Sequence, residues 1–150
     1  MSGKPVEISA TSERIGVKDH VCLHPAYRGR GRPGIYIPAR CGLESQLTEL
    51  RIFDVDVPRQ AVRGYALVIW GTVPLSTREL VADFQGGRAR GAVLRVPRGL
   101  AWKTGAPAPF SAFIIELPIG AACHPIRLRA VGSSARERLG ARPKLCGLAR

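Results

Sequence analysis

Two short segments between apolar runs combine an arginine with small residues. The first is Ala39-Arg40-Cys41-Gly42, and the second is Arg63-Gly64. An arginine fork and the backbone amides of a loop together suit a bound phosphate group. We therefore predict a phosphate or ligand site at Arg40, Cys41, Gly42, Arg63 and Gly64. The alternative is an ordinary turn that holds a buried thiol.

Three residues that can ligate zinc alternate along one strand-like segment. They are His20, Cys22 and His24. A spacing of two places side chains on the same face of a strand, so the three can lie side by side. A fourth ligand would come from Cys41, Cys123 or His124. The simpler interpretation is a strand with a small buried thiol and no cofactor, because free cysteine is commonly a core residue.

Five arginines fall in two glycine-rich segments that the sequence predicts as loops. Residues 27–34 contain Arg28, Arg30 and Arg32, and residues 85–91 contain Arg88 and Arg90. Flexible Arg-Gly loops suit contact with the backbone of RNA or DNA, and Tyr27 and Tyr36 could stack on bases. The alternatives are contact with an acidic protein surface and plain solvated charge.

The two aspartates Asp54 and Asp56 are two residues apart and so share one face of a predicted strand. Paired carboxylates can perform acid–base chemistry or hold Mg²⁺. Salt bridging to the surplus of arginine is the simpler explanation. The sequence contains no Ser-His-Asp arrangement, phosphate-binding loop or dinucleotide fingerprint.

The composition favours a single basic β domain. The 150 residues suit one core, and the 17 glycines and 12 prolines favour short strands over long helices. The net charge is +12, with 19 arginines and only 4 lysines among the cations. Such a surplus favours a polyanionic partner, which is either nucleic acid or an acidic protein face. A GC-rich genome also enriches arginine, but it does not deplete acidic residues.

The cysteines and the apolar runs indicate an intracellular protein. The four cysteines are widely spaced, and residues 1–5 do not resemble the start of an export signal. We therefore expect reduced thiols, in the cytoplasm or the nucleus. No apolar run approaches the ~18 residues that a membrane-spanning helix needs, so no membrane partner is expected.

Alternating and continuous apolar runs predict about eight or nine short strands in one domain, residues 1–150. The predicted strands cover residues 6–8, 18–24, 35–37, 51–57, 65–70, 79–84, 92–96, 112–117 and 126–131. In the last of these, apolar residues alternate with Arg127 and Arg129. Ser134 and Glu137 form a capping box, and Gly140 follows as a stop, so a short C-terminal helix is expected there. Residues 1–17 and 141–150 are predicted to be loose.

The segment from residue 35 to residue 70 resembles the trimeric dUTPase family. In that family a P-R-S-G-L loop is followed at a similar distance by a D-x-D-Y-x-G loop and an apolar strand. Here residues 38–43 (P-A-R-C-G-L) stand for the first motif, and Arg63-Gly64 with the strand 65–70 stand for the second. Residues 103–105 (K-T-G) and 113–116 (F-I-I-E) are similar to two later motifs of the family.

The resemblance implies an all-β barrel or sandwich and a trimer, but it does not imply hydrolysis. The motif serine is replaced by Cys41, and residues 58–60 contain no carboxylate where the family's water-activating aspartate would fall. Hydrolysis needs a base within hydrogen-bond reach of the attacking water. The chain is therefore more similar to virus-encoded relatives of dUTPases that have lost the activity and act as interaction modules.

Three functions remain open at this point. The leading hypothesis is a non-catalytic interaction or assembly protein with a basic surface, plausibly viral. The second is a nucleic-acid-binding or ribonucleoprotein subunit of the same fold class. The third is a nucleotide hydrolase of the dUTPase type with displaced catalytic residues.

Overall fold

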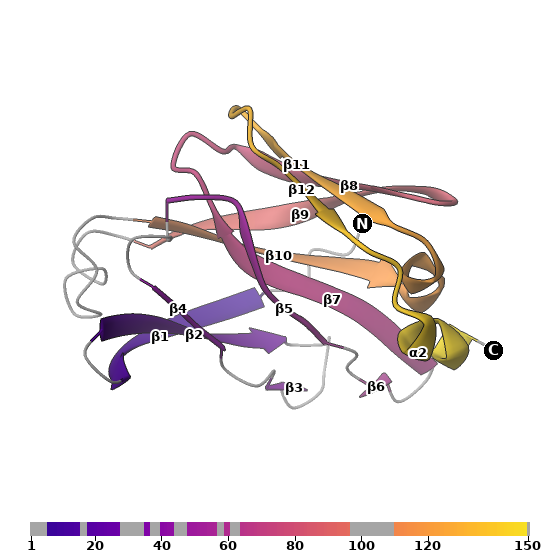
Figure 1. Ribbon diagram of the computed structural model, residues 1–150, viewed down its shortest axis with the longest axis horizontal. Coiled ribbons are helices and arrows are strands. Elements are labelled where there is room, and N and C mark those ends of the chain that lie inside the picture. Colours follow the sequence, from indigo (N-terminus) through magenta and orange to yellow (C-terminus); the bar gives the residue numbers. More distant parts are fainter. Residues whose placement is uncertain are drawn as a thin grey trace.

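Antiparallel strands form most of the computed structural model (Figure 1). The structure describes residues 6–15, 18–27, 35–36, 40–43, 48–56, 59–60, 64–96 and 110–149. The strands are β1 (Val6–Ile15), β2 (Lys18–Tyr27), β3 (Ile35–Tyr36), β4 (Arg40–Leu43), β5 (Arg51–Asp56), β6 (Arg59–Gln60), β7 (Gly64–Val73), β8 (Glu79–Phe84), β9 (Gly87–Val96), β10 (Phe110–Pro118), β11 (Ile126–Val131) and β12 (Arg136–Leu139). Two short 3-10 helices and one α-helix complete the described chain: η2 (Ile119–Cys123), α2 (Pro143–Cys146) and η3 (Gly147–Ala149).

The larger of two sheets holds eight strands. Seven follow the order β12-β11-β8-β9-β10-β7-β5, and β6 pairs with β7 off this path. They form a strongly curved, barrel-like layer (Figure 1). The smaller sheet has the order β1-β2-β3, with β4 paired to β2, and β4 lies next to β5 of the larger sheet. The predicted all-β class is confirmed, whereas likeness to dUTPases stays a hypothesis.

The centre of the larger sheet is built from the two most apolar strands of the sequence. In β7 and β10, Trp70 is the Cα partner of Ile114, and Leu67 is the partner of Leu117. Each of these four side chains is at most 4% exposed, so both faces of the pair are covered. Strands buried on both faces read as continuous apolar runs, which is why the sequence predicts them well.

The strands β8 and β11 turn one face to the core and the other outward, and on the outward face of β8 Val81 is itself covered, at 5% exposed. Leu80 and Ala82 of β8 and Leu128 and Ala130 of β11 point into the core, while the residues between them point outward. The alternation predicted for residues 126–131 is therefore confirmed. Its consequence is that the outward faces of these strands are free to carry charge.

The predicted helix that begins at Ser134 is wrong. Residues 136–139 form β12, which pairs with β11, and a tight turn at Gly132 (φ +96°) joins the two strands. Within that turn, the amide of Ala130 donates to the carbonyl of Ala135 at 3.1 Å, and the amide of Ala135 donates to Ser133 Oγ at 2.9 Å. Pairing with β11 satisfies several backbone groups at once, which outweighs a local capping signal. The short helix lies further on, at α2.

A disulfide joins Cys123 to Cys146, with Cα atoms 4.7 Å apart. The expectation of reduced thiols is therefore wrong for these two residues. The bond ties α2 to η2, and the Arg142 amide also donates to the Ala122 carbonyl at 2.8 Å. Residues 141–149 are thus attached to η2, which follows β10, by one covalent and one hydrogen bond.

Two segments predicted as loops are strands. Residues 40–43 form β4, which pairs with β2. The predicted seven-residue loop 85–91 is a two-residue turn, Gln85-Gly86, because β9 already begins at Gly87. Gly86 has φ +100°, which only glycine adopts at little cost, so the hairpin turns tightly. The strands predicted at residues 79–84 and 92–96 are confirmed, as β8 and as the second half of β9. Among the described residues, no helix is long and apolar enough to span a membrane.

Candidate anion-binding face

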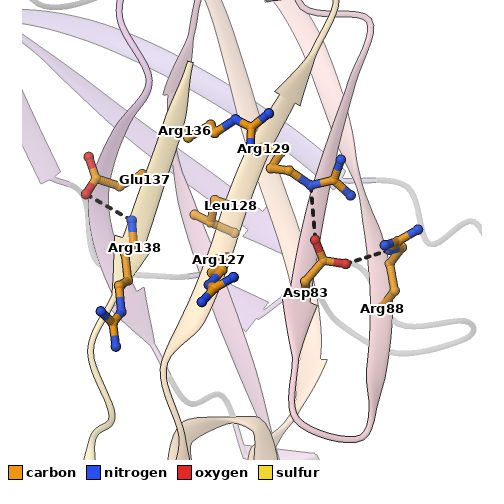
Figure 2. Close-up of a pocket in the computed structure, with 8 residues that line it drawn as sticks. All are labelled: Asp83, Arg88, Arg127, Leu128, Arg129, Arg136, Glu137 and Arg138. Atoms are coloured by element: carbon orange, nitrogen blue, oxygen red, sulfur yellow. Dashed lines mark hydrogen bonds and ion pairs between the residues drawn. The ribbon is translucent and has the colours of Figure 1, made fainter. Parts of the chain in front are cut away.

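An open hollow of about 500 Å³ lies on the outward surface of β8, β9, β11 and β12 (Figure 2). Its lining residues are Asp83, Arg88, Arg127, Leu128, Arg129, Arg136, Glu137 and Arg138. Arg90 extends the same surface along β9. We call this surface the arginine face and define it by Arg88, Arg90, Arg127, Arg129, Arg136 and Arg138.

Strand register sets the arginines in two rows across the sheet. In the first row, Arg138, Arg127, Asp83 and Arg88 are successive Cα partners on β12, β11, β8 and β9. In the second row, the sequence of partners is Arg136, Arg129, Val81 and Arg90. Each strand therefore contributes to both rows through residues two apart, which share a face because strand side chains alternate.

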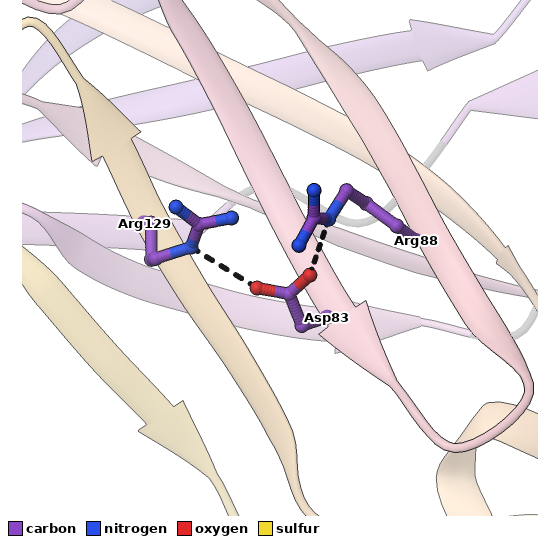
Figure 3. Close-up of polar contacts among 3 residues, drawn as sticks. All are labelled: Asp83, Arg88 and Arg129. Carbon is purple, nitrogen blue, oxygen red and sulfur yellow. Dashed lines mark hydrogen bonds and ion pairs between the residues drawn. The ribbon is translucent and has the colours of Figure 1, made fainter.

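Asp83 is the acidic centre of the face (Figure 3). Its carboxylate accepts from Arg88 Nε at 2.5 Å and from Arg129 Nε at 3.0 Å. The hydrogen bond from Arg88 does most to hold the pKa of Asp83 below its ordinary value of 3.8, and Arg129 acts in the same direction. Asp83 is therefore ionised at neutral pH. Glu79 plays a similar part at the edge of the face, 3.3 Å from Arg90.

The other three arginines have no acidic partner in the part of the chain that the structure describes. Among the described residues, no carboxylate lies within ion-pair distance of Arg127, Arg136 or Arg138. Two of the cross-strand pairs, Arg127 with Arg138 and Arg129 with Arg136, bring like charges directly opposite each other. Such pairs are destabilising by a few tenths of a kcal/mol to about 1 kcal/mol each. A bound anion placed between them would turn that repulsion into attraction.

The predicted nucleic-acid residues are divided by the structure. Arg88 and Arg90 belong to the arginine face, and their side chains are 62% and 65% exposed. They stand on strand β9, not on a flexible loop, so their positions are fixed by pairing with β8. Arg28, Arg30 and Arg32 lie outside the described residues.

The predicted phosphate site is also divided. Arg40, Cys41 and Gly42 are in β4, and Gly64 is the first residue of β7. Arg63 lies outside the described residues. The backbone of residues 40–42 is paired with β2, so the loop amides expected to hold a phosphate are strand amides. The phosphate site stays a prediction.

The predicted zinc residues His20, Cys22 and His24 all lie in β2, where register makes Cys41 the Cα partner of Cys22. Cys123 is bonded to Cys146 and so has no thiolate to offer as a fourth ligand. Where side chains are described, in residues 48–55, 66–95 and 110–149, no three His, Cys, Asp or Glu residues form a metal-binding group. The zinc site at β2 stays a prediction.

The paired aspartates lie on β5, where Asp54 and Asp56 are the Cα partners of Trp70 and Val68. Asp54 Oδ1 accepts a hydrogen bond from the following amide, of Val55, at 2.9 Å. A β-bulge between Ile52 and Asp54 interrupts the register just before this point. The structure therefore places this pair on β5, apart from the residues that line the hollow.

Four arginines of the face were missed as functional residues: Arg127, Arg129, Arg136 and Arg138. The alternation around Arg127 and Arg129 placed them on an exposed strand face but gave no sign of neighbours. Arg136 and Arg138 were missed because the sequence predicts a helix there, and a helix would not place them beside Arg127 and Arg129. Their spacing of two in a segment that follows another Arg-x-Arg is the signal that could have found them.

No protein-family model, characterised protein or solved structure matches this chain. The resemblance to trimeric dUTPases therefore rests on the quoted sequence segments alone. The function has to be argued from the arginine face itself.

Proposed function

We propose that this chain is a non-catalytic interaction domain that binds an acidic partner through its arginine face. Three arginines that no described carboxylate neutralises, set on the same surface as three more from β9 and β11, carry the proposal. Holding like charges opposite each other costs stability, so the arrangement is favourable only when an anion is present. A role in assembly, plausibly viral as the dUTPase resemblance suggests, belongs to the same proposal.

Catalysis has little support at this surface. A general acid or base works best when its pKa lies near the working pH. Within the hollow, Asp83 is held in the opposite condition, since Arg88 and Arg129 lower its pKa and occupy its two oxygens. The lining of the hollow offers Glu137 as its other carboxylate, and that side chain accepts from the Arg138 amide at 3.1 Å. The chemistry present is that of binding.

The proposal is tested by titrating the purified chain with two fluorescent polyanions, a nucleic-acid duplex and polyglutamate, at low salt. We expect at least one probe to bind, and the double variant Arg127→Gln/Arg138→Gln to weaken that binding. The double variant Arg142→Gln/Lys144→Gln removes the same two charges from exposed residues outside the lining of the hollow and should leave binding nearly unchanged. If neither probe binds, or if both variants lose binding equally, the arginine face is not the binding surface.

A further inference from the structure

We infer that the partner of the arginine face is the phosphodiester backbone of a double-stranded nucleic acid. This inference rests on the proposed function and narrows the acidic partner to one class. Three properties of the face carry it. The residues described there offer no apolar anchor and no aromatic side chain, and their charges are arranged in two rows across the strands.

The lack of an apolar anchor argues against an acidic protein as the partner. Protein interfaces are held by a few aromatic or aliphatic side chains buried at the centre of the contact. The apolar residues nearest the arginines are Val81, which is 5% exposed, and Leu128, which points into the core and is 0% exposed. Both are already covered by this chain's own core or neighbours. A protein partner would therefore contact this face only through ion pairs, and exposed ion pairs contribute little affinity.

The lack of aromatic side chains argues against a single-stranded nucleic acid. Proteins that bind single strands stack bases on Phe, Tyr or Trp, with about 1–3 kcal/mol per base. Among the described residues, the lining of the hollow consists of five arginines, two carboxylates and Leu128, and it contains no aromatic ring. Backbone contact without base contact is the mode by which proteins hold duplexes in a sequence-independent way.

The grid of charge matches a duplex backbone in scale. Neighbouring strands are about 4.8 Å apart, so the four strands of the face span about 14 Å, and arginines two apart along a strand are about 7 Å apart. A duplex carries one charge per about 1.7 Å of its axis, so about 14 Å of duplex presents roughly eight phosphates, of which about half face one side. About four phosphates would thus face five arginines: Arg127, Arg136 and Arg138, which no described carboxylate pairs, and Arg88 and Arg129, which Asp83 binds.

Asp83 orients two of these arginines without consuming them. Both of its hydrogen bonds use the Nε donor of the arginine, from Arg88 and from Arg129. The terminal N–H donors of each guanidinium are left for another acceptor, and arginine can present two of them side by side to one phosphate. Asp83 is therefore a positioning residue for the arginines beside it.

The experiment measures the affinity of the full chain for a duplex of about 20 base pairs by fluorescence anisotropy, between about 50 and 200 mM salt. If three to four phosphates are neutralised, a plot of the logarithm of the association constant against the logarithm of the salt concentration should have a slope of about −3. The association constant should therefore fall roughly 60-fold between about 50 and 200 mM salt. Two duplexes of unrelated sequence should bind equally. Duplex RNA and duplex DNA are both used, since the backbone charge is common to them.

The variants Arg127→Gln, Arg136→Gln and Arg138→Gln should each make the slope less steep by about 1. Arg142→Gln serves as the charge-matched control and should leave the slope unchanged. A thermal melt of each variant, monitored by circular dichroism, shows that the fold is retained, because each residue replaced is exposed.

Competing probes separate the possible failures. If single-stranded oligothymidine of the same length binds more tightly than the duplex, the inference is overturned in favour of single strands. If polyglutamate binds and the duplex does not, the inference fails while the proposed function stands. If neither binds, both fail. A duplex that binds with a slope unaffected by the three arginine variants also overturns the inference, because binding then occurs elsewhere on the chain.

Discussion

The turn at Gly132 gives the sharpest test of how β12 is held in place. Gly132 has φ +96°, and a Cβ atom added there would lie 2.4 Å from the backbone oxygen of Ser76. Nearby, the Arg78 amide donates to the Val131 carbonyl at 2.8 Å, so the Ser76 oxygen belongs to a segment that is itself hydrogen-bonded. The neighbour cannot move away without breaking this contact between the turn and the start of β8.

We therefore expect Gly132→Ala to destabilise the fold through two separate effects. A left-handed backbone costs an alanine about 1–2 kcal/mol. Forcing a methyl group into occupied space costs about 1–3 kcal/mol more. The reduced freedom of the unfolded chain returns about 0.4–1 kcal/mol. The net loss of unfolding free energy is about 1–5 kcal/mol, which for a chain of 150 residues corresponds to a fall in Tm of roughly 2–20 °C.

Two other glycines separate these effects. Gly86 has φ +100° but nothing within 4 Å of an added Cβ, so Gly86→Ala should cost only the backbone term, about 1 kcal/mol. Gly120 has neither feature, so Gly120→Ala should be close to neutral. The assay is urea unfolding of the three variants and the wild type with the disulfide intact. Equal losses for Gly132→Ala and Gly86→Ala would refute the close approach to Ser76.

Three further predictions concern an ion pair, a close strand contact and the disulfide. Asp83→Asn should lower the unfolding free energy at pH 7 by about 0.2–1 kcal/mol. Because the pKa of Asp83 is lowered in the folded state, this difference from wild type should persist above pH 3.8 and vanish as the pH falls through the folded pKa. Denaturant titrations at several pH values measure the difference. Gly71→Ala should prevent β5 from pairing with β7, since an added Cβ would lie 1.8 Å from the Arg51 carbonyl oxygen, and a loss of soluble, folded protein by circular dichroism is expected. The double variant Cys123→Ala/Cys146→Ala should lose about 3 kcal/mol of unfolding free energy, as expected for a loop of 23 residues, and peptide mapping of unreduced wild type should find these two cysteines linked.

Each of these outcomes can fail in a recognisable way. A pH-independent difference between Asp83→Asn and wild type would mean that the carboxylate acts through packing and not through charge. A well-folded Gly71→Ala variant would contradict the close approach of the two strands. If peptide mapping of protein purified without reductant finds the thiols of Cys123 and Cys146 free, the disulfide does not form.

The central strands could be predicted because their sequences leave little choice. Residues 65–70 and 112–117 are almost wholly apolar, and the structure buries both faces of each. Prolines and glycines bound these runs and exclude long helices. Residues 126–131 were equally clear, because Arg127 and Arg129 alternate with three apolar side chains that the core takes up.

The region after Gly132 was predicted wrongly because its local signal and its tertiary setting disagree. Ser134 and Glu137 fit the start of a helix, and nothing in the segment itself names a partner strand. The exposed edge of β11 provides that partner, and pairing with it makes β12. The same change moves Arg136 and Arg138 from a helix to the sheet that carries Arg127 and Arg129.

The class of the fold, the strands of its core and the surplus of positive charge could all be predicted from the amino-acid sequence. Those properties follow from residue type and period, which act within a few residues of each other. Assembly of the sheet brings six arginines from three strands, β9, β11 and β12, onto one surface, and folding of the chain brings Cys123 to Cys146. Strand order and register are set by which segments of the chain bury each other's faces. No short pattern along the chain indicates which strands become neighbours, so the arginine face could not be predicted before the strand order was known.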